Sequence, residues 1–274
     1  MSSEPQQVSA ALVSAVNPGG AGAAKGMAEA LGGGWLELWY QPKIGSRTLD
    51  LQGAEALIRM CHPQLGIVQP ARFIPRMGAR LLPALSQFVI ARALADWRYF
   101  LAEQRPLDLS INLPISFFDD PKSFDYLCRQ LPDDPAFEGL ILEVDSSEIT
   151  RDLSAARDFA RQARLRKIAI SVDRLGGEWA TLQLRDFPFV EIKVEPELVA
   201  GCARDRAKRT LCRHVIDTAN QLGARTVAVG IENYADFCTA RALGFDLVQG
   251  FLFAKPMGVQ TFMRAIGPDP ATVV

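Results

Sequence analysis

Length, composition and charge exclude several classes of protein. With 274 residues and 49% hydrophobic content, the chain can bury one large core, and a single barrel fits this length as well as two small domains do. Thirty basic and 31 acidic residues leave a formal charge of -1, so no overall field attracts DNA, RNA or an anionic membrane, and an anionic ligand needs a local site. Five cysteines without CxxC spacing argue against a disulfide framework or a zinc ribbon and favour reduced thiols in a cytoplasmic protein.

The two ends of the chain differ from its middle. Residues 1–33 are rich in Ala, Gly and Ser and lack the basic start of a targeting signal, so we expect a flexible tail or linker there. No apolar run has the length of a membrane span. We expect one folded domain over residues 34–267, followed by a short C-terminal tail over 268–274.

From Trp35 onward, short apolar or β-branched runs alternate with longer stretches of helical periodicity. This alternation is typical of an α/β fold with a mainly parallel sheet, and eight strands in one domain favour a closed barrel. The expected strands are residues 36–42, 51–57, 107–113, 140–144, 167–173, 190–194, 226–231 and 247–253.

The connections predict how these strands run. About eight residues, 43–50, join the first two, which is too short for a crossover helix, so the first strand should be antiparallel to the second. A helix with Pro83 in its first turn is expected before the third strand. Further helices are expected over residues 154–164, 206–222 and 234–243, the last ending at Gly244.

Glu55 stands between Ala54 and Ala56 in a segment that otherwise has the pattern of a buried strand. Ionised side chains are rarely buried unless they are paired or bind a metal. Glu55 therefore either faces a cation inside the fold, or lies at a strand end in water or in a salt bridge with Arg59.

Other polar residues interrupt the apolar runs near their carboxyl ends. Each one alone can be a strand-end residue that meets solvent, but in a barrel the carboxyl ends of the strands converge on the face that carries the chemistry. Their recurrence in strand after strand therefore favours a shared site. These residues are Glu55, Asn112, Glu143, Asp173, Lys193, Glu232 and Gln249.

The composition of this set indicates phosphate chemistry. The carboxylates and the amide of Glu55, Asn112, Glu143 and Asp173 are hard oxygen ligands that suit Mg, Mn or Ca. Lys193 supplies a point charge for a phosphate or an attacking oxyanion. Together they predict a metal-assisted phosphate site.

The ordered series of motifs resembles the EAL domain family of bacterial cyclic di-GMP phosphodiesterases, over about residues 36–266. A single EAL tripeptide is weak evidence, whereas the series in order is strong. The motifs are Tyr40-Gln41-Pro42, Glu55-Ala56-Leu57 with Arg59, Leu142-Glu143, Ile192-Lys193, Gly230-Ile231-Glu232 and Gln249-Gly250-Phe251.

The resemblance implies a modified (β/α)8 TIM-type barrel with an antiparallel first strand, in which two Mg or Mn ions activate a water that opens cyclic di-GMP. It implies that Arg59 contacts the ligand phosphate and that Lys193 lies beside the water. The first metal would be held by Glu55, Asn112, Glu143 and Asp173, and the nucleotide groove would be lined by Gln41, Leu57, Gln249 and Phe251.

Three positions depart from the family pattern. Arg174 stands where the family has an aspartate that binds the second metal, Ser146 replaces a glutamate, and Val229 replaces the glutamate usually assigned as general base. The site is therefore about four charge units more positive than in active relatives, and two close divalent ions need the missing negative charge. We expect no stable two-metal centre, and only Lys193 and Glu232 remain of the catalytic residues.

These departures separate binding from hydrolysis. Losing a general base typically costs a factor of about 10² to 10⁴ in rate. A phosphodiester is anionic, so Arg174 can still form charge-assisted hydrogen bonds to it, or it can pair instead with Glu178 or a freed acidic neighbour. In the family the following loop, residues 174–181 here, links the metal site to the dimer contact, so its altered sequence leaves a homodimer open.

Three functions follow from the resemblance. The first is a catalytically inactive EAL-like receptor for cyclic di-GMP in bacterial second-messenger signalling, which passes the signal to a protein partner in the cytoplasm. The second is a protein-interaction adaptor that no longer binds the nucleotide, and the third is a weak residual phosphodiesterase. One Mg or Mn ion is compatible with the retained ligands, and the receptor function requires none.

Overall fold

The computed structural model describes residues 29–77, 81–166, 168–175 and 189–267. Most of the tail predicted over residues 1–33, and all of the tail predicted over 268–274, lie outside these ranges. Residues 29–32 are helical, and Ala30 is fully buried in the hydrophobic core. The domain bounds at residues 34 and 267 stay predictions.

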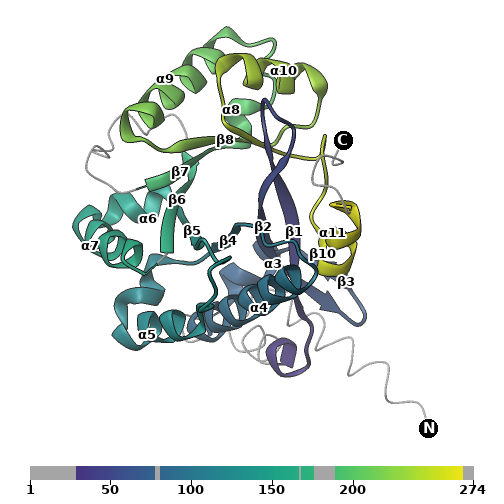
Figure 1. Cartoon of the computed structure of the whole chain (residues 1–274), viewed down its shortest axis with the longest axis vertical. Helices are drawn as coiled ribbons and strands as arrows, with labels where there is room; N and C mark the ends of the chain where they lie inside the picture. Colours follow the sequence, from purple (N-terminus) through teal and green to yellow (C-terminus); the bar gives the residue numbers. More distant parts are fainter. Residues whose placement is uncertain (1–28, 78–80, 167, 176–188, 268–274) are drawn as a thin grey trace.

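A closed ring of eight strands forms the centre of the described part of the molecule (Figure 1). The pairing of β1 with β2 closes a sheet that otherwise runs from β1 through β9, β8, β7, β6, β5 and β4 to β2. The eight strands are β1 (Leu36–Gly45), β2 (Leu51–His62), β4 (Leu109–Asn112), β5 (Leu140–Asp145), β6 (Ile168–Leu175), β7 (Phe189–Val194), β8 (Arg225–Val229) and β9 (Leu247–Gln249).

The first strand runs against its neighbours. β1 is antiparallel to both β2 and β9, whereas the pairs from β2 through β9 are parallel. Gln41 pairs with Glu55 across the β1–β2 hairpin, so the two side chains leave neighbouring backbones. Two short strands, β3 (Gly66–Val68) and β10 (Met257–Gly258), extend the sheet beyond the ring. The predicted barrel with an antiparallel first strand is confirmed.

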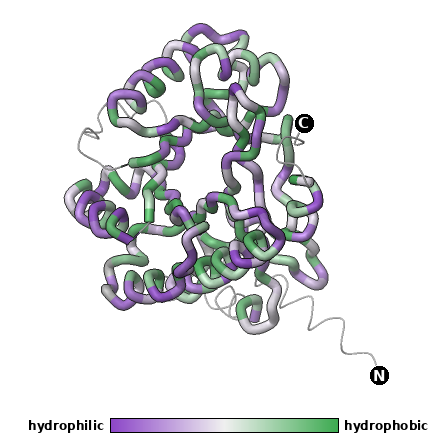
Figure 2. Tube along the Cα trace, in the orientation of Figure 1, coloured by the Kyte–Doolittle hydropathy of each residue, from purple (hydrophilic) through white to green (hydrophobic). Residues whose placement is uncertain are grey.

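Helices surround the ring on its outer side (Figure 1), and their bounds in chain order are α3 (Pro70–Phe73), η1 (Ile74–Arg76), α4 (Leu82–Ala102), η2 (Ile115–Asp119), α5 (Pro121–Gln130), α6 (Ser146–Arg151), α7 (Leu153–Arg164), α8 (Pro196–Val199), α9 (Arg206–Leu222), α10 (Tyr234–Leu243) and α11 (Val259–Ala265). Hydrophobic and hydrophilic residues alternate along these helices, as expected when one side packs on the barrel (Figure 2). None of the helices in the described ranges has the length and apolar content of a membrane span.

The predicted helix ends agree with the structure where the sequence contains clear capping residues. The carboxylate of Asp205 accepts hydrogen bonds from the N–H groups of Ala207 and Lys208, and it starts α9 at the predicted residue. Gly244 adopts a left-handed conformation with φ of 102° and ends α10 as predicted. Pro83 lies in the first turn of α4, also as predicted.

Two predicted strands are too long at their carboxyl ends. β8 ends at Val229 because Gly230 turns the chain with φ of 82°, and the N–H groups of Gly230 and Ile231 both donate to the carbonyl of Gln249. β9 ends at Gln249, and a turn follows in which the N–H of Phe253 donates to the carbonyl of Gly250. The residues that follow β8 and β9 thus form turns that contact each other at the end of the barrel. The hydrophobic pattern of the sequence does not indicate these turns.

Candidate functional site

Lys193 is the centre of the polar cluster inside the barrel. It lies on β7, and its Nζ is 2.9 Å from Glu55 Oε2 and 2.5 Å from Glu143 Oε2, with Asp173 Oδ1 at 3.7 Å. Glu55 comes from β2, Glu143 from β5 and Asp173 from β6. Three acids predicted at strand ends therefore converge on the ammonium group of Lys193.

Glu55 is also held by two amide side chains. Asn112 Nδ2 donates to Glu55 Oε1 at 2.8 Å, and Gln249 Nε2 donates to Glu55 Oε2 at 2.9 Å. Gln249 Nε2 also lies 3.3 Å from Gln41 Oε1, and Gln41 Nε2 donates to the carbonyl of Ala254 at 3.1 Å. Among the described residues, the buried Oε1 of Gln249 has no hydrogen-bond donor. The Nε2 group of Gln249 must face Glu55 to donate to it, and this fixes the orientation of the Gln249 amide. Its Oε1 is therefore available as an acceptor inside the site.

A second cation, Lys43, lies deeper in the barrel. Its Nζ is 2.9 Å from Glu143 Oε1, 2.5 Å from Glu191 Oε1 and 2.7 Å from Ser110 Oγ, and its side chain is 1% exposed. Arg225 Nε donates to Glu191 Oε2 at 3.0 Å from the opposite side. Glu143 therefore lies between two lysines, and Lys43 and Glu191 support the site from below.

Lys43 and Glu191 were not among the predicted site residues, although strand periodicity indicates both. Side chains two residues apart on a strand point to the same face. Glu191 is two residues before Lys193, and Lys43 is two residues after Gln41. Both therefore share the inward face of a residue already assigned to the site.

The lysines set the ionisation of the buried acids. Burial opposes ionisation of Glu55, but the attraction of Lys193 outweighs it and holds the pKa of Glu55 well below its ordinary value. Burial and the neighbouring charge of Glu55 raise the pKa of Glu143 despite its two lysine partners. The pKa values of Lys43 and Lys193 are raised because attraction to these acids exceeds the cost of burial.

The other predicted site residues differ in how far they are exposed. Arg59 is only 6% exposed, and its Nη1 donates to the carbonyl of Ile58 at 2.8 Å. Leu57 is half-buried and Glu232 is exposed. Phe251 is 52% exposed, and the Lys255 ammonium lies 5.5 Å from the centre of its ring.

Arg174 projects from the end of β6 with 72% of its side chain exposed. Its Nη1 is 3.8 Å from Asp145 Oδ2, so it pairs loosely with an acidic neighbour. Its backbone is left-handed, with φ of 54°, and its N–H donates to Asp173 Oδ1 at 2.9 Å. The alternative partner Glu178 and the predicted loop segment from Gly176 onward lie outside the described residues.

The two other substituted positions flank the cluster. Ser146 begins α6, and its hydroxyl donates to the carbonyl of Arg174 at 3.0 Å. Val229 is the last residue of β8 and pairs with Gln249 of β9. Neither residue can supply a carboxylate at these two positions.

In the described part of the chain, the acids of the cluster pair with lysine side chains. Lys193 takes one oxygen each of Glu55 and Glu143, and within the described ranges no three His, Cys, Asp or Glu side chains are placed to hold a metal ion. The assignment of Glu55, Asn112, Glu143 and Asp173 as metal ligands stays a prediction. The charge at the centre of the site is that of an ammonium group.

Comparison with known proteins identifies relatives of the whole barrel. The EAL domain family model matches residues 25–256. The Pseudomonas aeruginosa protein named cyclic di-GMP phosphodiesterase PA2567 is 36% identical over 225 residues, which are 81% of this chain and 38% of that protein. The chain thus spans less than half the length of this relative.

Solved structures share the same fold. The PaMucR phosphodiesterase, solved as a c-di-GMP complex, is 27% identical with a TM-score of 0.80, and the match covers 87% of this chain and 98% of that one. Klebsiella pneumoniae BlrP1, solved as a manganese and cy-diGMP complex, is 23% identical with a TM-score of 0.71, and the match covers 82% of this chain and 57% of that one.

Proposed function

Because the chain belongs to the EAL domain family of cyclic di-GMP signalling proteins, we propose that it is a cytoplasmic receptor that binds cyclic di-GMP without hydrolysing it. The receptor would pass the signal to a protein partner. The relatives indicate cyclic di-GMP as the ligand, and the residues of this chain favour binding without hydrolysis.

The observation that carries this proposal is the uneven loss within one site. The inner half is intact, because Lys193, Asn112 and Gln249 hold Glu55 at hydrogen-bond distance. The outer rim presents Arg174 and Val229 where the family resemblance implies carboxylates. A site with this charge distribution favours an anionic ligand and lacks the base that would activate a water.

Arg174 is the residue we assign to the ligand phosphate. Its guanidinium is exposed, and its ion pair with Asp145, at 3.8 Å, is long, so a phosphodiester can replace that contact at little cost. The free Oε1 of Gln249 offers an acceptor for a donor group of the ligand or an ordered water. The side chain of Arg59 is buried, so it would form part of the pocket wall and would not move to meet the ligand.

Isothermal titration with cyclic di-GMP tests the proposal. We expect saturable heat with the wild-type protein at tens of micromolar, with or without a chelator, because the receptor function requires no metal. Arg174→Asp should weaken binding about tenfold or more, since it replaces a charge-assisted contact by repulsion. The matched control is Arg204→Asp, a charge reversal in the exposed turn before α9.

The outcomes separate the competing functions. No heat with the wild-type protein would leave the adaptor function, in which only protein contacts remain. Equal weakening by Arg174→Asp and Arg204→Asp would show that overall charge, rather than a contact from Arg174, controls binding.

A residual phosphodiesterase is the second candidate, and the 36% identity to a cyclic di-GMP phosphodiesterase favours it. With Val229 at the general-base position, we expect turnover at least about 10²-fold below that of an active relative. Chromatography after incubation with Mg or Mn would detect the linear dinucleotide. Product formed by the wild-type protein but not by Glu55→Ala would establish this activity and contradict the receptor that does not hydrolyse its ligand.

A further inference from the structure

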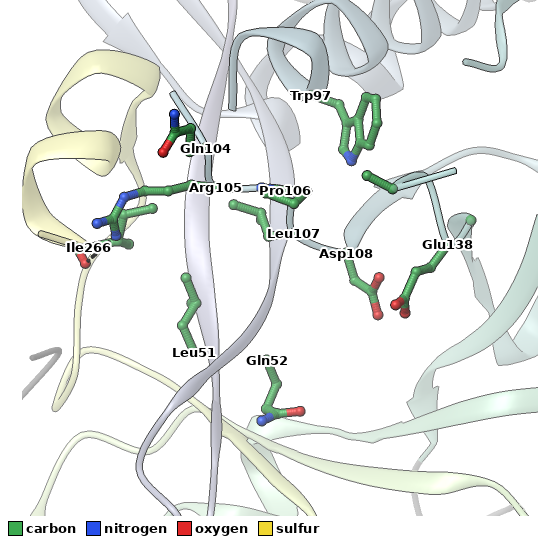
Figure 3. A pocket seen from close by; sticks show the side chains of 12 residues that line it. Leu51, Gln52, Trp97, Gln104, Arg105, Pro106, Leu107, Asp108, Glu138 and Ile266 are labelled. Carbon is green, nitrogen blue, oxygen red and sulfur yellow. Dashed lines mark hydrogen bonds between the residues drawn. The ribbon is translucent and has the colours of Figure 1, made fainter. Parts of the chain in front are cut away.

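A cavity lies at the amino-terminal ends of the parallel strands, on the side of the barrel opposite to the candidate site. Its volume is about 440 Å³, within the range of roughly 300–1,000 Å³ typical of small-molecule sites. Leu51 at the start of β2, Asp108 before β4 and Glu138 before β5 contribute to its walls (Figure 3). A second cavity of about 480 Å³ shares Asp108 and Glu138 with it, so the two form one hollowed surface.

The walls divide into an apolar part and an acidic part. Leu51, Leu107 and Ile266 line one side, and the carboxylates of Asp108 and Glu138 lie together on the other (Figure 3). The guanidinium of Arg105 turns away from these acids and donates to the carbonyl of Ile266 at 3.1 Å. The cavity therefore presents hydrocarbon at one end and negative charge at the other.

The neighbouring cation only partly balances this charge. Arg225 Nη2 lies 3.8 Å from Asp108 Oδ2, while its Nε is hydrogen-bonded to Glu191 at 3.0 Å. Burial raises the pKa of Asp108, and the nearby Glu138 raises it further against the attraction of Arg225. A second positive group beside Asp108 would relieve this repulsion.

We propose that this cavity binds a primary aliphatic amine, with the ammonium group between Asp108 and Glu138 and the hydrocarbon stem along Leu51 and Leu107. An alkylammonium matches both halves of the cavity, because it donates three hydrogen bonds at one end and buries methylene groups at the other. An anion would meet two carboxylates, and an uncharged hydrocarbon would leave both of them without a new partner.

Titration with n-butylamine, in the absence of any nucleotide, tests this proposal independently of cyclic di-GMP binding. We expect saturable binding to the wild-type protein and no saturable binding of 1-butanol, which has the same hydrocarbon chain but no charge. Asp108→Asn and Glu138→Gln should each weaken butylamine binding about tenfold or more. Asp217→Asn, an exposed substitution on α9, should leave it unchanged.

Amide chemical shifts of the wild-type protein provide a second measurement that does not depend on variants that fold. Butylamine should shift the signals of Gln52, Leu107 and Gly139, which line the cavity, at lower concentrations than those of α9. Absence of saturable binding up to tens of millimolar butylamine would overturn the proposal. Equal binding by wild-type protein and the Asp108→Asn/Glu138→Gln double variant, or shifts confined to other surfaces, would overturn it as well.

Discussion

The Lys193 ammonium lies 2.5 Å from Glu143 Oε2, and both side chains are buried inside the barrel. Burial shields both charged groups from solvent, so each one depends on the opposite charge of the other for its stabilisation. The same ammonium holds Glu55, so one side chain fixes two acids of the candidate site.

Replacing Lys193 by methionine should strongly destabilise the fold. Lys193→Met leaves Glu55 and Glu143 without their shared cation, and breaking a buried pair typically costs about 3–5 kcal/mol. Urea denaturation measures the loss in free energy of unfolding. Lys122→Met on the exposed surface of α5 is the control and should change it by less than about 0.5 kcal/mol. A loss below about 1 kcal/mol for Lys193→Met would show that water reaches these acids.

Lys43 and Glu191 should be energetically coupled. Their 2.5 Å contact is fully buried, so either Lys43→Met or Glu191→Gln alone removes one of the two oppositely charged partners of the remaining buried charge. The double variant should be less destabilised than the two single losses together predict, with a coupling of about 0.5–3 kcal/mol. A double-mutant cycle measured by urea denaturation gives this value, and additive losses would contradict the contact.

Asp236 should contribute stability that depends on pH. Burial opposes its ionisation, but hydrogen bonds from the N–H groups of Ala203 and Gly201 and from Asn233 Nδ2 lower its pKa. Because the folded-state pKa lies below the unfolded value of about 3.9, the stabilisation is complete above about pH 5 and is lost as the pH falls through the unfolded and then the folded pKa.

Asp236→Asn tests this dependence. The variant should lose about 1–3 kcal/mol at pH 7, and the difference from wild type should shrink as the pH falls from 5 to 3. Urea denaturation at a series of pH values measures both quantities, with Asp217→Asn on the exposed side of α9 as the control. A difference that stays constant below pH 4 would argue against an ionised Asp236 in the fold.

Gly250 should tolerate no side chain. A Cβ at this position would lie 2.1 Å from the carbonyl oxygen of Ile231, which belongs to the turn beside the candidate site. Gly250→Ala should therefore cost more than about 2 kcal/mol, because two backbone segments must separate. The contrasting variant Gly66→Ala meets no atom within 4 Å and strains only a positive φ of 67°, at about 1 kcal/mol. Thermal unfolding of both variants measures the difference, and equal losses would contradict the close approach.

The sequence predicts much of the fold because its signals are local. The ends of α9 and α10 follow from Asp205, Gly223 and Gly244, whose capping chemistry depends only on neighbouring residues. The turns after Val229 and Gln249 depend instead on a contact between Gly250 and Ile231, which are 19 positions apart in the printed sequence. Such a contact leaves no mark in the hydrophobic pattern.

Part of the membership of the candidate site was predictable from the sequence, but its pairing was not. The polar positions near strand ends indicated that Glu55, Glu143, Asp173 and Lys193 would meet, and the structure brings them together. It does not follow from the pattern that Lys193 occupies the centre or that Lys43 lies beneath Glu143. Those relationships depend on how far each side chain reaches inside a closed ring.

The contact between Lys43 and Glu191 also constrains how the barrel can fold. The two residues are 148 positions apart, and β1 must pair with β9 as well as β2 to close the ring. Until β7 has joined, the interior position of Lys43 lacks one of its two carboxylate partners, and contacts this distant in sequence form slowly. Ring closure and charge neutralisation should therefore occur in one late cooperative step. A fragment that ends before β7 should remain unable to bury its first strand.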